Sequence, residues 1–451
     1  MHGVGGRHAA ALLASLALLT GCSVVPPQGP TAGTDRTSTA GTTTGTTGGP
    51  TSDGAAPTQP VAALLPDPAV LAAKLKRVSR SGIQALGMVV IDPATGVTLA
   101  SRGDRPLVPA SSMKVLTTAV ALDLVGADTR FSTSVVQDGE RSIVLVGGGD
   151  PLLTDATSTS AARPASLQEL ARTVAAALKQ TGARKVRLGY DETLFTGSDF
   201  NPGWERRWRS FVPPVSALTV DTGRYDNWQA HRDPAAVAAK AFAARLRAEG
   251  IKVTGVTARQ APATGITVAE VTSAPLATIV KRTLRISDNV AAEILARHAA
   301  LAAGQPGSFD GAATAIAGWL ASHGLWDDAQ RVTDGSGLSG GTQVRPSTLA
   351  GVVSLALSDE RLAALVVGLP VAGVSGTLKD RFNDPSEKAG RRVVHAKTGT
   401  LTGISSLTGY LTTRDGTRLV FSAVANRAVG QTTAYNWLDR SASVVARCGC
   451  R

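Results

Sequence analysis

The stretch "PASSMKVLTT", residues 109–118, decides how the rest of the chain is interpreted. Ser111 stands one helical turn before Lys114, behind Pro109, and no other S-x-x-K occurs in the sequence. Apolar residues at helical spacing follow, so the stretch predicts a helix that starts around Ser111 with this serine as a candidate N-cap. The pattern has two explanations. Either Ser111 caps the helix and Lys114 is solvated, or the pair acts chemically, because residues three apart share a helix face.

Two further short motifs occur once each, so that the chain order is S-x-x-K, S-D-N, K-T-G. Ser287-Asp288-Asn289 lies inside a segment that otherwise has the pattern of one helix, with Val290, Ile294 and Leu295 on its buried side. Lys397-Thr398-Gly399-Thr400 follows a β-rich run at 393–394. Each motif alone is weak evidence. The ordered triple is found in penicillin-binding proteins and class A β-lactamases.

The three motifs together supply what a serine nucleophile needs. A serine hydroxyl is a poor nucleophile until a base lies within hydrogen-bond reach, and none of the six histidines has a suggestive setting. Lys114 can be that base if burial and a second cation, Lys397, depress its pKa. Ser287 can relay a proton to the leaving group, while Asn289 can bind a substrate amide and position Lys114. The backbone N–H groups of Ser111 and Thr400 would form an oxyanion hole.

The candidate site therefore has two parts. The predicted catalytic residues are Ser111, Lys114, Ser287, Asn289 and Lys397. The predicted substrate-binding residues are Thr398, Gly399 and Thr400, whose strand would offer hydroxyls to a substrate carboxylate. This chemistry requires no metal and no organic cofactor.

After about residue 66 the chain resembles the low-molecular-mass class C penicillin-binding proteins, the D-alanyl-D-alanine carboxypeptidase/endopeptidase family that includes penicillin-binding protein 4. The stretches "LVGGGDPLL", "DGSGLSGG" and "LPVAGVSGTLKDRF" extend the resemblance beyond the three motifs. It implies a mixed α/β fold, in which a β-lactamase/transpeptidase-like domain has an antiparallel sheet flanked by helices. A large inserted α/β domain would interrupt it. The expected limits are 66–130 and 272–451 for the peptidase domain and 131–271 for the insert.

The spacing of the motifs favours this family over the β-lactamases. Ser287 follows Ser111 by 176 positions, far more than a compact β-lactamase core places between these motifs. The intervening segment has β-rich runs and helix-like stretches at 167–180 and 235–249, so it has the composition of a folded insert. Where the family commonly has an acidic pair after Gly-Trp, this chain has Glu205-Arg206-Arg207. The preferred stem-peptide side chain is therefore left open.

The N-terminus predicts export. A basic residue, Arg7, precedes an apolar run at 9–19 that is shorter than the ~20 residues needed to span a bilayer. Residues 1–21 thus have the pattern of a signal peptide. Leu19-Thr20-Gly21-Cys22 resembles a bacterial lipobox, which implies a lipid on Cys22; the alternative is a buried helix with an incidental cysteine. Residues 22–65, rich in Thr, Gly and Pro, predict a disordered tether to the outer face of the cytoplasmic membrane.

Charge and cysteine content exclude some other functions. The formal charge is +12, but the 46 Lys and Arg are scattered and form no basic-aromatic stripe, so we predict no nucleic-acid binding. Cys448 and Cys450 could form a small disulfide or stay reduced, and they supply only two of the four ligands of a usual zinc site. We assign them no chemistry.

The sequence therefore predicts an exported, lipid-anchored serine D-Ala-D-Ala carboxypeptidase of the bacterial cell wall. Its substrates would be peptidoglycan stem peptides ending in D-Ala-D-Ala, and a cross-linked amide as leaving group would give DD-endopeptidase activity. β-Lactam antibiotics would acylate Ser111. Two alternatives remain at this point: a β-lactamase-like hydrolase, and a non-catalytic wall-binding lipoprotein that kept the scaffold.

Overall fold

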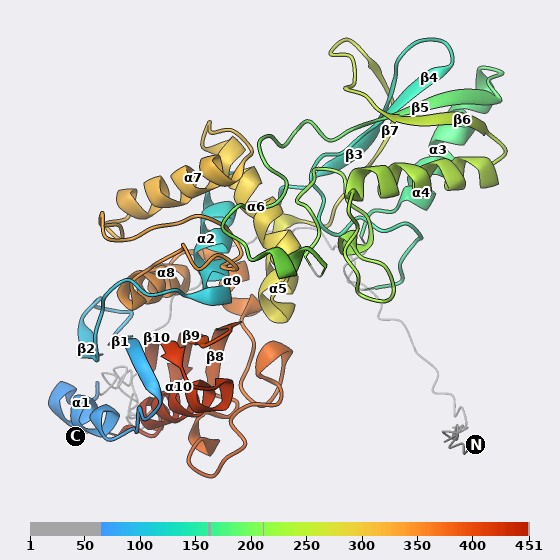
Figure 1. The fold of residues 1–451 in the computed structure, drawn as a ribbon. Helices are drawn as coiled ribbons and strands as arrows, with labels where there is room; N and C mark the ends of the chain where they lie inside the picture. The colour runs from blue at the N-terminus through green and yellow to red at the C-terminus, as the bar shows by residue number, and fades with distance from the viewer. Residues whose placement is uncertain (1–64, 161–163, 211, 450–451) are drawn as a thin grey trace, which may run out of the picture. The chain divides into compact units, whose positions relative to one another are not determined.

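A computed structural model of the chain describes residues 65–160, 164–210 and 212–449 (Figure 1). The expected signal peptide, Cys22 and all but the last residue of the expected tether lie outside these residues. Among the helices that are described, none combines the length and the apolar character needed to cross a membrane. Cys448 takes part in a disulfide, and Cys450 is outside the described residues.

The first sheet joins two parts of the chain that are distant in sequence. Its order is β2 (Thr98–Ser101), β1 (Ile83–Ile91), β10 (Arg418–Ala428), β9 (Ile404–Thr412) and β8 (Val394–Leu401). All neighbouring strands are antiparallel. Strands β1 and β2 form a hairpin, at whose turn Asp92 accepts from the N–H of Ala94 and Gly96 adopts φ +73°.

Successive side chains of β1 point to opposite faces of this sheet, and both faces are buried. Val89 and Ile91 pack into the apolar cluster that contains α2, while Met88 and Val90 pack into the cluster on the opposite face. This two-sided burial follows from the two-residue period of a strand and explains why β1 is almost continuously apolar. The opposite face is covered by α1 (Pro68–Lys76) and α10 (Gln431–Ala446), as Figure 1 shows.

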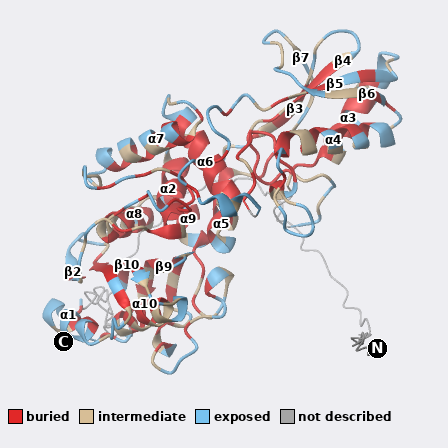
Figure 2. Ribbon diagram, in the orientation of Figure 1, coloured by how far each residue is buried: buried red, intermediate tan, exposed pale blue. Residues whose placement is uncertain are grey.

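A group of helices covers the α2 face of the sheet. They are α2 (Met113–Val125), α5 (Leu276–Ile286), α6 (Asn289–Ala302), α7 (Phe309–Ser322), α8 (Pro346–Ser358) and α9 (Ala363–Gly368). Figure 2 shows that α2 and α6 are buried over most of their length. Of the motif residues on these two helices, Lys114 on α2 is buried and Asn289 at the start of α6 is partly buried.

A second sheet lies wholly between α2 and α5 in sequence. Its order is β6 (Lys252–Ala258), β5 (Lys185–Asp191), β4 (Ser142–Val146), β3 (Ser132–Gln137) and β7 (Ile266–Thr272). The β4–β5 and β5–β6 pairs are parallel and the others antiparallel. Helices α3 (Leu167–Gln180) and α4 (Pro234–Ala248) bury their apolar sides in the same cluster as this sheet. The mixed α/β fold is as predicted; the exact limits 66–130, 131–271 and 272–451 stay predictions.

The second motif corrects one expectation about the helices. The segment around Ser287 is not one continuous helix, because α5 ends at Ile286 and Ser287 adopts a left-handed conformation with φ +59°. Asp288 then begins a new helix, since its side chain accepts from the N–H of Ala291. The cause is local: Asp competes for the backbone as an N-cap, and a residue with positive φ cannot continue a right-handed helix.

Candidate active site

The first motif begins with a tight turn before α2. Ser111 lies in the short 3₁₀ turn Ala110–Ser112, and α2 itself starts at Met113. The expectation that Ser111 caps the helix is wrong, because Pro109 and Ser112 hold the cap positions of the turn and of α2, and neither makes a side-chain cap bond. The Ser111 hydroxyl is instead 3.0 Å from Lys114 Nζ. The same turn places Ala110 at φ +46°, a conformation that L-residues rarely adopt.

Lys114 is fully buried and surrounded by oxygen atoms. Its Nζ donates to Ser111 Oγ at 3.0 Å, to Asn289 Oδ1 at 2.7 Å and to the carbonyl of Ser336 at 2.7 Å. Burial lowers the pKa of Lys114 to about 8, against the opposing effect of the nearby carboxylates, of which Glu293 has the largest influence. Asn289 thus lies within hydrogen-bond reach of Lys114, and its role in positioning that amine stays a prediction.

The three neighbours of Lys114 differ in what they can do with a proton. The Asn289 amide oxygen and the Ser336 carbonyl can only accept, whereas a serine hydroxyl can both donate and accept. A neutral amine has two N–H bonds and one lone pair. Its two protons are therefore directed to Asn289 and Ser336, and its lone pair to the hydroxyl of Ser111. This arrangement suits Lys114 to accept a proton from Ser111.

A second buried lysine, Lys397 of the third motif, lies beside Ser287 of the second motif. Lys397 Nζ donates to Ser287 Oγ at 2.9 Å and to the carbonyl of Thr398 at 2.6 Å. Burial, followed by the charge of Lys114, holds the pKa of Lys397 well below its usual value. All five predicted catalytic residues are therefore linked in two hydrogen-bonded groups, one around Lys114 and one around Lys397.

Strand β8 passes directly beside the turn that carries Ser111. A Cβ atom on Gly399 would lie 2.6 Å from the carbonyl oxygen of Pro109 and 3.0 Å from the nitrogen of Ser111, so only glycine permits this approach. The Thr398 hydroxyl bonds to that of Thr377 at 2.7 Å. The hydroxyl of Thr400, an exposed residue, bonds to Tyr435 at 2.7 Å.

Several residues that hold the site were missed by sequence reasoning. Ser406 on β9 bonds to the Pro109 carbonyl at 2.6 Å and to the Ser112 hydroxyl at 2.8 Å. Asn426 on β10 bonds to both the N–H and the carbonyl of Val108, at 2.9 and 3.0 Å. Their strands are more than 290 positions from the first motif, so no local pattern indicates the contacts. For Asn426, a polar residue after the mostly apolar run of β10 was the available signal, whereas Ser406 lies in a strand rich in Ser and Thr and gave none.

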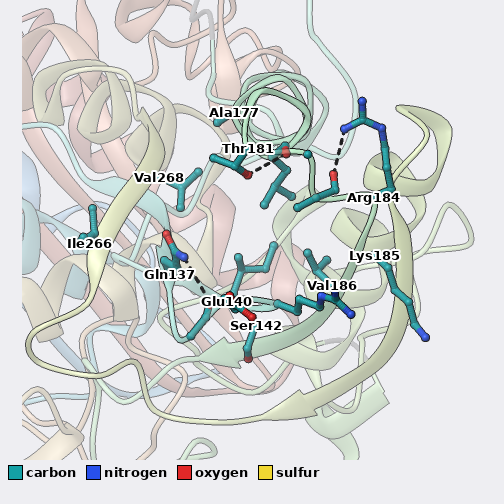
Figure 3. Close-up of a pocket in the computed structure, with 16 residues that line it drawn as sticks. Gln137, Glu140, Ser142, Ala177, Thr181, Arg184, Lys185, Val186, Ile266 and Val268 are labelled. Carbon is teal, nitrogen blue, oxygen red and sulfur yellow. Dashed lines mark hydrogen bonds between the residues drawn. The ribbon is translucent and has the colours of Figure 1, made fainter.

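A cavity of about 370 Å³ adjoins the second motif. From the second motif and α5 it is lined by Arg282, Ile286, Ser287, Asp288 and Asn289, and from the segment between β5 and α4 by Trp208, Val212, Thr222, Arg224 and Trp228. A larger cavity of about 670 Å³ lies at β3, β4 and α3 and contains none of the predicted site residues (Figure 3). Polar groups there bond within the lining: Thr181 donates to Leu178 and Gln137 to Gly139. Among the described residues, no cluster of His, Cys, Asp or Glu could hold a metal ion.

Comparison with known proteins places the chain in a family. The family model described as the D-Ala-D-Ala carboxypeptidase 3 (S13) family matches residues 69–231 and 225–447. The chain belongs to this family. The resemblance to penicillin-binding protein 4 that the sequence motifs indicate is thereby confirmed, and the chain is classed with the hydrolases of the S13 family.

Named relatives agree with the S13 assignment. Carboxypeptidase DacB of Mycolicibacterium smegmatis is 36% identical over 81% of this chain and 82% of that protein. The D-alanyl-D-alanine carboxypeptidase of Actinomadura sp. is 30% identical over 75% and 77%. The crystal structure of penicillin binding protein 4 from Haemophilus influenzae has a TM-score of 0.70 at 22% identity, covering 82% of this chain and 97% of that one. This last likeness confirms the fold.

Proposed function

We propose that the chain is a serine-type D-Ala-D-Ala carboxypeptidase in which Ser111 forms an acyl-enzyme. The observation that carries the proposal is the hydrogen bond between Ser111 Oγ and the amine of Lys114, whose two other neighbours can only accept. With its pKa lowered to about 8, Lys114 is neutral often enough near physiological pH to act as a base. The S13 membership supplies the substrate class.

In the first step Lys114 takes the proton of Ser111 as Oγ attacks the carbonyl carbon of the penultimate D-alanine. The oxyanion would be held by the N–H groups of Ser111 and Thr400. The C–N bond then breaks, and the proton returns through Ser287 to the amine of the departing D-alanine. Water attacks the ester, restores Ser111 and releases the shortened peptide. The same cycle with a cross-linking amide as leaving group is DD-endopeptidase activity.

Substrate would enter from the side of the exposed Thr400. The hydroxyls of Thr398 and Thr400 lie on β8 beside the nucleophile turn, where they suit the terminal carboxylate of the peptide. The cavity beside Ser287 and Asn289 offers room for the rest of the stem peptide. β-Lactams, whose ring amide resembles the D-Ala-D-Ala bond, would acylate Ser111; the related H. influenzae protein has been solved with a β-lactam.

We further propose that the enzyme acts outside the cytoplasmic membrane. The support is sequence-based: the apolar run at 9–19 and the lipobox-like residues ending at Cys22. Peptidoglycan, the substrate class of the family, lies in the same compartment. Labelled-palmitate incorporation that disappears in Cys22→Ala supports the lipid anchor, and unchanged labelling contradicts it.

The nucleophile is tested by intact-mass spectrometry of the purified chain after brief exposure to a fluorescent penicillin. We expect one adduct in the wild type, none in Ser111→Ala, and one in Ser160→Ala, which removes an exposed serine outside the site. An adduct retained in Ser111→Ala refutes the assignment. If the wild type shows no adduct, turnover of a chromogenic cephalosporin identifies a β-lactamase, and absence of turnover identifies a non-catalytic scaffold.

A further inference from the structure

The carbonyl of Ser336 is one of the two obligatory acceptors for the amine of Lys114. It belongs to the loop at 334–341 between α7 and α8, which has no regular secondary structure. A loop carbonyl can turn away from a buried amine by rotation of the peptide groups on either side. The direction of the Lys114 lone pair therefore depends on what holds this loop.

Two side chains hold the peptide group between Gly335 and Ser336 at both ends. Glu293 accepts from the N–H of Gly335 at 3.0 Å and from the N–H of Ser336 at 2.7 Å. Thr117 donates to the carbonyl of Gly335 at 2.6 Å. Both side chains are fully buried, so water does not compete for these bonds. The peptide plane that precedes the Ser336 carbonyl is thus fixed from two directions.

Helix periodicity explains why these two residues are in the right places. Asn289 and Glu293 are four apart on α6, and Lys114 and Thr117 are three apart on α2. Each helix therefore presents one residue of the Lys114 group and one residue that binds the loop on the same face. Gly335 allows the close approach, because a Cβ there would lie 2.6 Å from Ala296 Cβ.

We propose that Glu293 is a positioning residue for the Lys114 base: it orients the Gly335–Ser336 peptide so that the Ser336 carbonyl takes one Lys114 proton and the lone pair faces Ser111. The inference rests on the proposed role of Ser111 and Lys114. Glu293 itself touches neither the nucleophile nor the substrate. Its effect on the reaction passes through the loop and through its charge.

The charge of Glu293 gives the proposal a signature that a purely structural residue lacks. Its carboxylate is the largest of the influences that raise the pKa of Lys114, followed by Asp334 in the loop and Asp288 at the start of α6. The neighbouring group holds Lys397 on β8, whose pKa is lowered by burial and by the charge of Lys114. Burial lowers the pKa of Arg297 on α6, and the charge of Glu293 opposes this effect. Burial, followed by the charge of Asp334, raises the pKa of Glu293 itself to about 7.

The test measures the second-order rate of penicillin acylation of the full chain across a pH range that spans the Lys114 pKa of about 8. In the wild type the rate should rise with pH, which is the ascending limb of the profile, and then reach a plateau. Glu293→Gln preserves side-chain shape but removes the negative charge, so the pKa of Lys114 falls and the ascending limb of the rate profile moves to lower pH. Its high-pH plateau also falls, because an amide NH₂ group now faces one backbone N–H. Thr117→Val retains the charge and loosens only the peptide, so the plateau falls about tenfold or more while the limb stays in place.

A matched control separates positioning from loss of stability. Asp191 in the second sheet is also a buried carboxylate that accepts from two backbone N–H groups, those of Thr193 at 2.8 Å and Ala261 at 2.7 Å. Asp191→Asn should lower the melting temperature and leave both limb and plateau unchanged.

Each outcome has a defined meaning. The proposal is overturned if the pH–rate profile of Glu293→Gln superimposes on that of the wild type. It is also overturned if Asp191→Asn shifts the ascending limb of the profile as much as Glu293→Gln does. If Glu293→Gln does not fold, an unchanged plateau in Thr117→Val overturns it alone. A wild type that shows neither an adduct nor turnover of a chromogenic cephalosporin is a different result, since it refutes the acyl-enzyme itself and the positioning role with it.

Discussion

At the scale of single residues, the proposed chemistry depends on two lysines that the fold removes from water. An ammonium group in a buried site loses hydration, and this cost favours the neutral amine. For Lys114, carboxylates on α6 and in the loop at 334–341 offset part of that cost, so its pKa is lowered only to about 8. For Lys397 the second influence is the like charge of Lys114, which lowers its pKa in the same direction as burial does.

The pH dependence of acylation follows from these shifts. Only the neutral amine of Lys114 can accept a proton, and protonation below its pKa of about 8 removes the base. The rate of penicillin acylation should therefore rise with pH and level off above about 8. Stopped-flow fluorescence with a labelled penicillin measures this profile. A rate independent of pH across that range would contradict a lysine base.

At the scale of secondary-structure elements, the break between α5 and α6 presents Ser287 and Asn289 to the site. Asp288 holds the break, because it caps α6 and pairs with Arg282 at 2.8 Å. Asp288→Ala should lower the free energy of unfolding by about 1 kcal/mol for the cap alone and also slow acylation. Urea unfolding and the penicillin assay measure the two effects. The control is Asp233→Ala, which removes the comparable N-cap of α4, at a similar cost in stability and with acylation unchanged.

The approach of β8 to the nucleophile turn leads to a second expectation at this scale. Gly399→Ala places a Cβ against Ser406 Oγ, the Pro109 carbonyl and the Ser111 nitrogen, so the strand must move away from Ser111. We expect acylation to fall by about a hundredfold, because a displacement near 1 Å disturbs the reacting geometry. Gly255→Ala on β6 meets open space and should leave acylation unaltered. Equal rates for the two variants would show that the close approach has no role.

At the scale of the whole molecule, the segment between β5 and α4 forms hydrogen bonds with the loop at 334–341 and with Thr333 just before it. Trp204 Nε1 donates to the buried carboxylate of Asp334 at 2.9 Å, and Asn201 bonds to the Thr333 carbonyl at 2.7 Å. Asp334 also accepts from the N–H of Ser339 at 2.8 Å. The segment that belongs to the predicted insert therefore helps to hold the loop that contacts Lys114.

This connection can be tested with two tryptophans that have the same kind of partner. Trp204→Phe keeps the ring but removes a hydrogen bond to a charged acceptor, which costs about 1.5–3 kcal/mol. It should also slow acylation, since Asp334 loses one of its anchors. Trp319→Phe removes an equivalent bond to Asp123, 2.7 Å long and outside the loop. Thermal unfolding should show similar losses for both, and only Trp204→Phe should affect penicillin labelling; equal rates would contradict the coupling.

Much of the fold is encoded in local patterns. The stretch at 167–180 forms α3 with the bounds that its apolar spacing predicts, and the β1–β2 hairpin follows from a turn with Pro93 and Gly96. Strands β3 and β6 were missed, because each is a polar-rich segment with only weak alternation. The break at Ser287 was missed because the apolar period continues across it, while a single left-handed residue leaves no mark in that period.

The sequence by itself determined which groups are proposed to react, because each side-chain type carries its own chemistry and the three short motifs occur in a recognisable order. The tertiary structure alone decided the surroundings in which these groups would act. Whether Lys114 is a base depends on its burial, on the direction of the Ser336 carbonyl and on the charge of Glu293, all contributed by distant segments. Hydration and electrostatic interactions depend on distances in space. For segments far apart in the chain, the spacing of residues in the sequence does not give those distances.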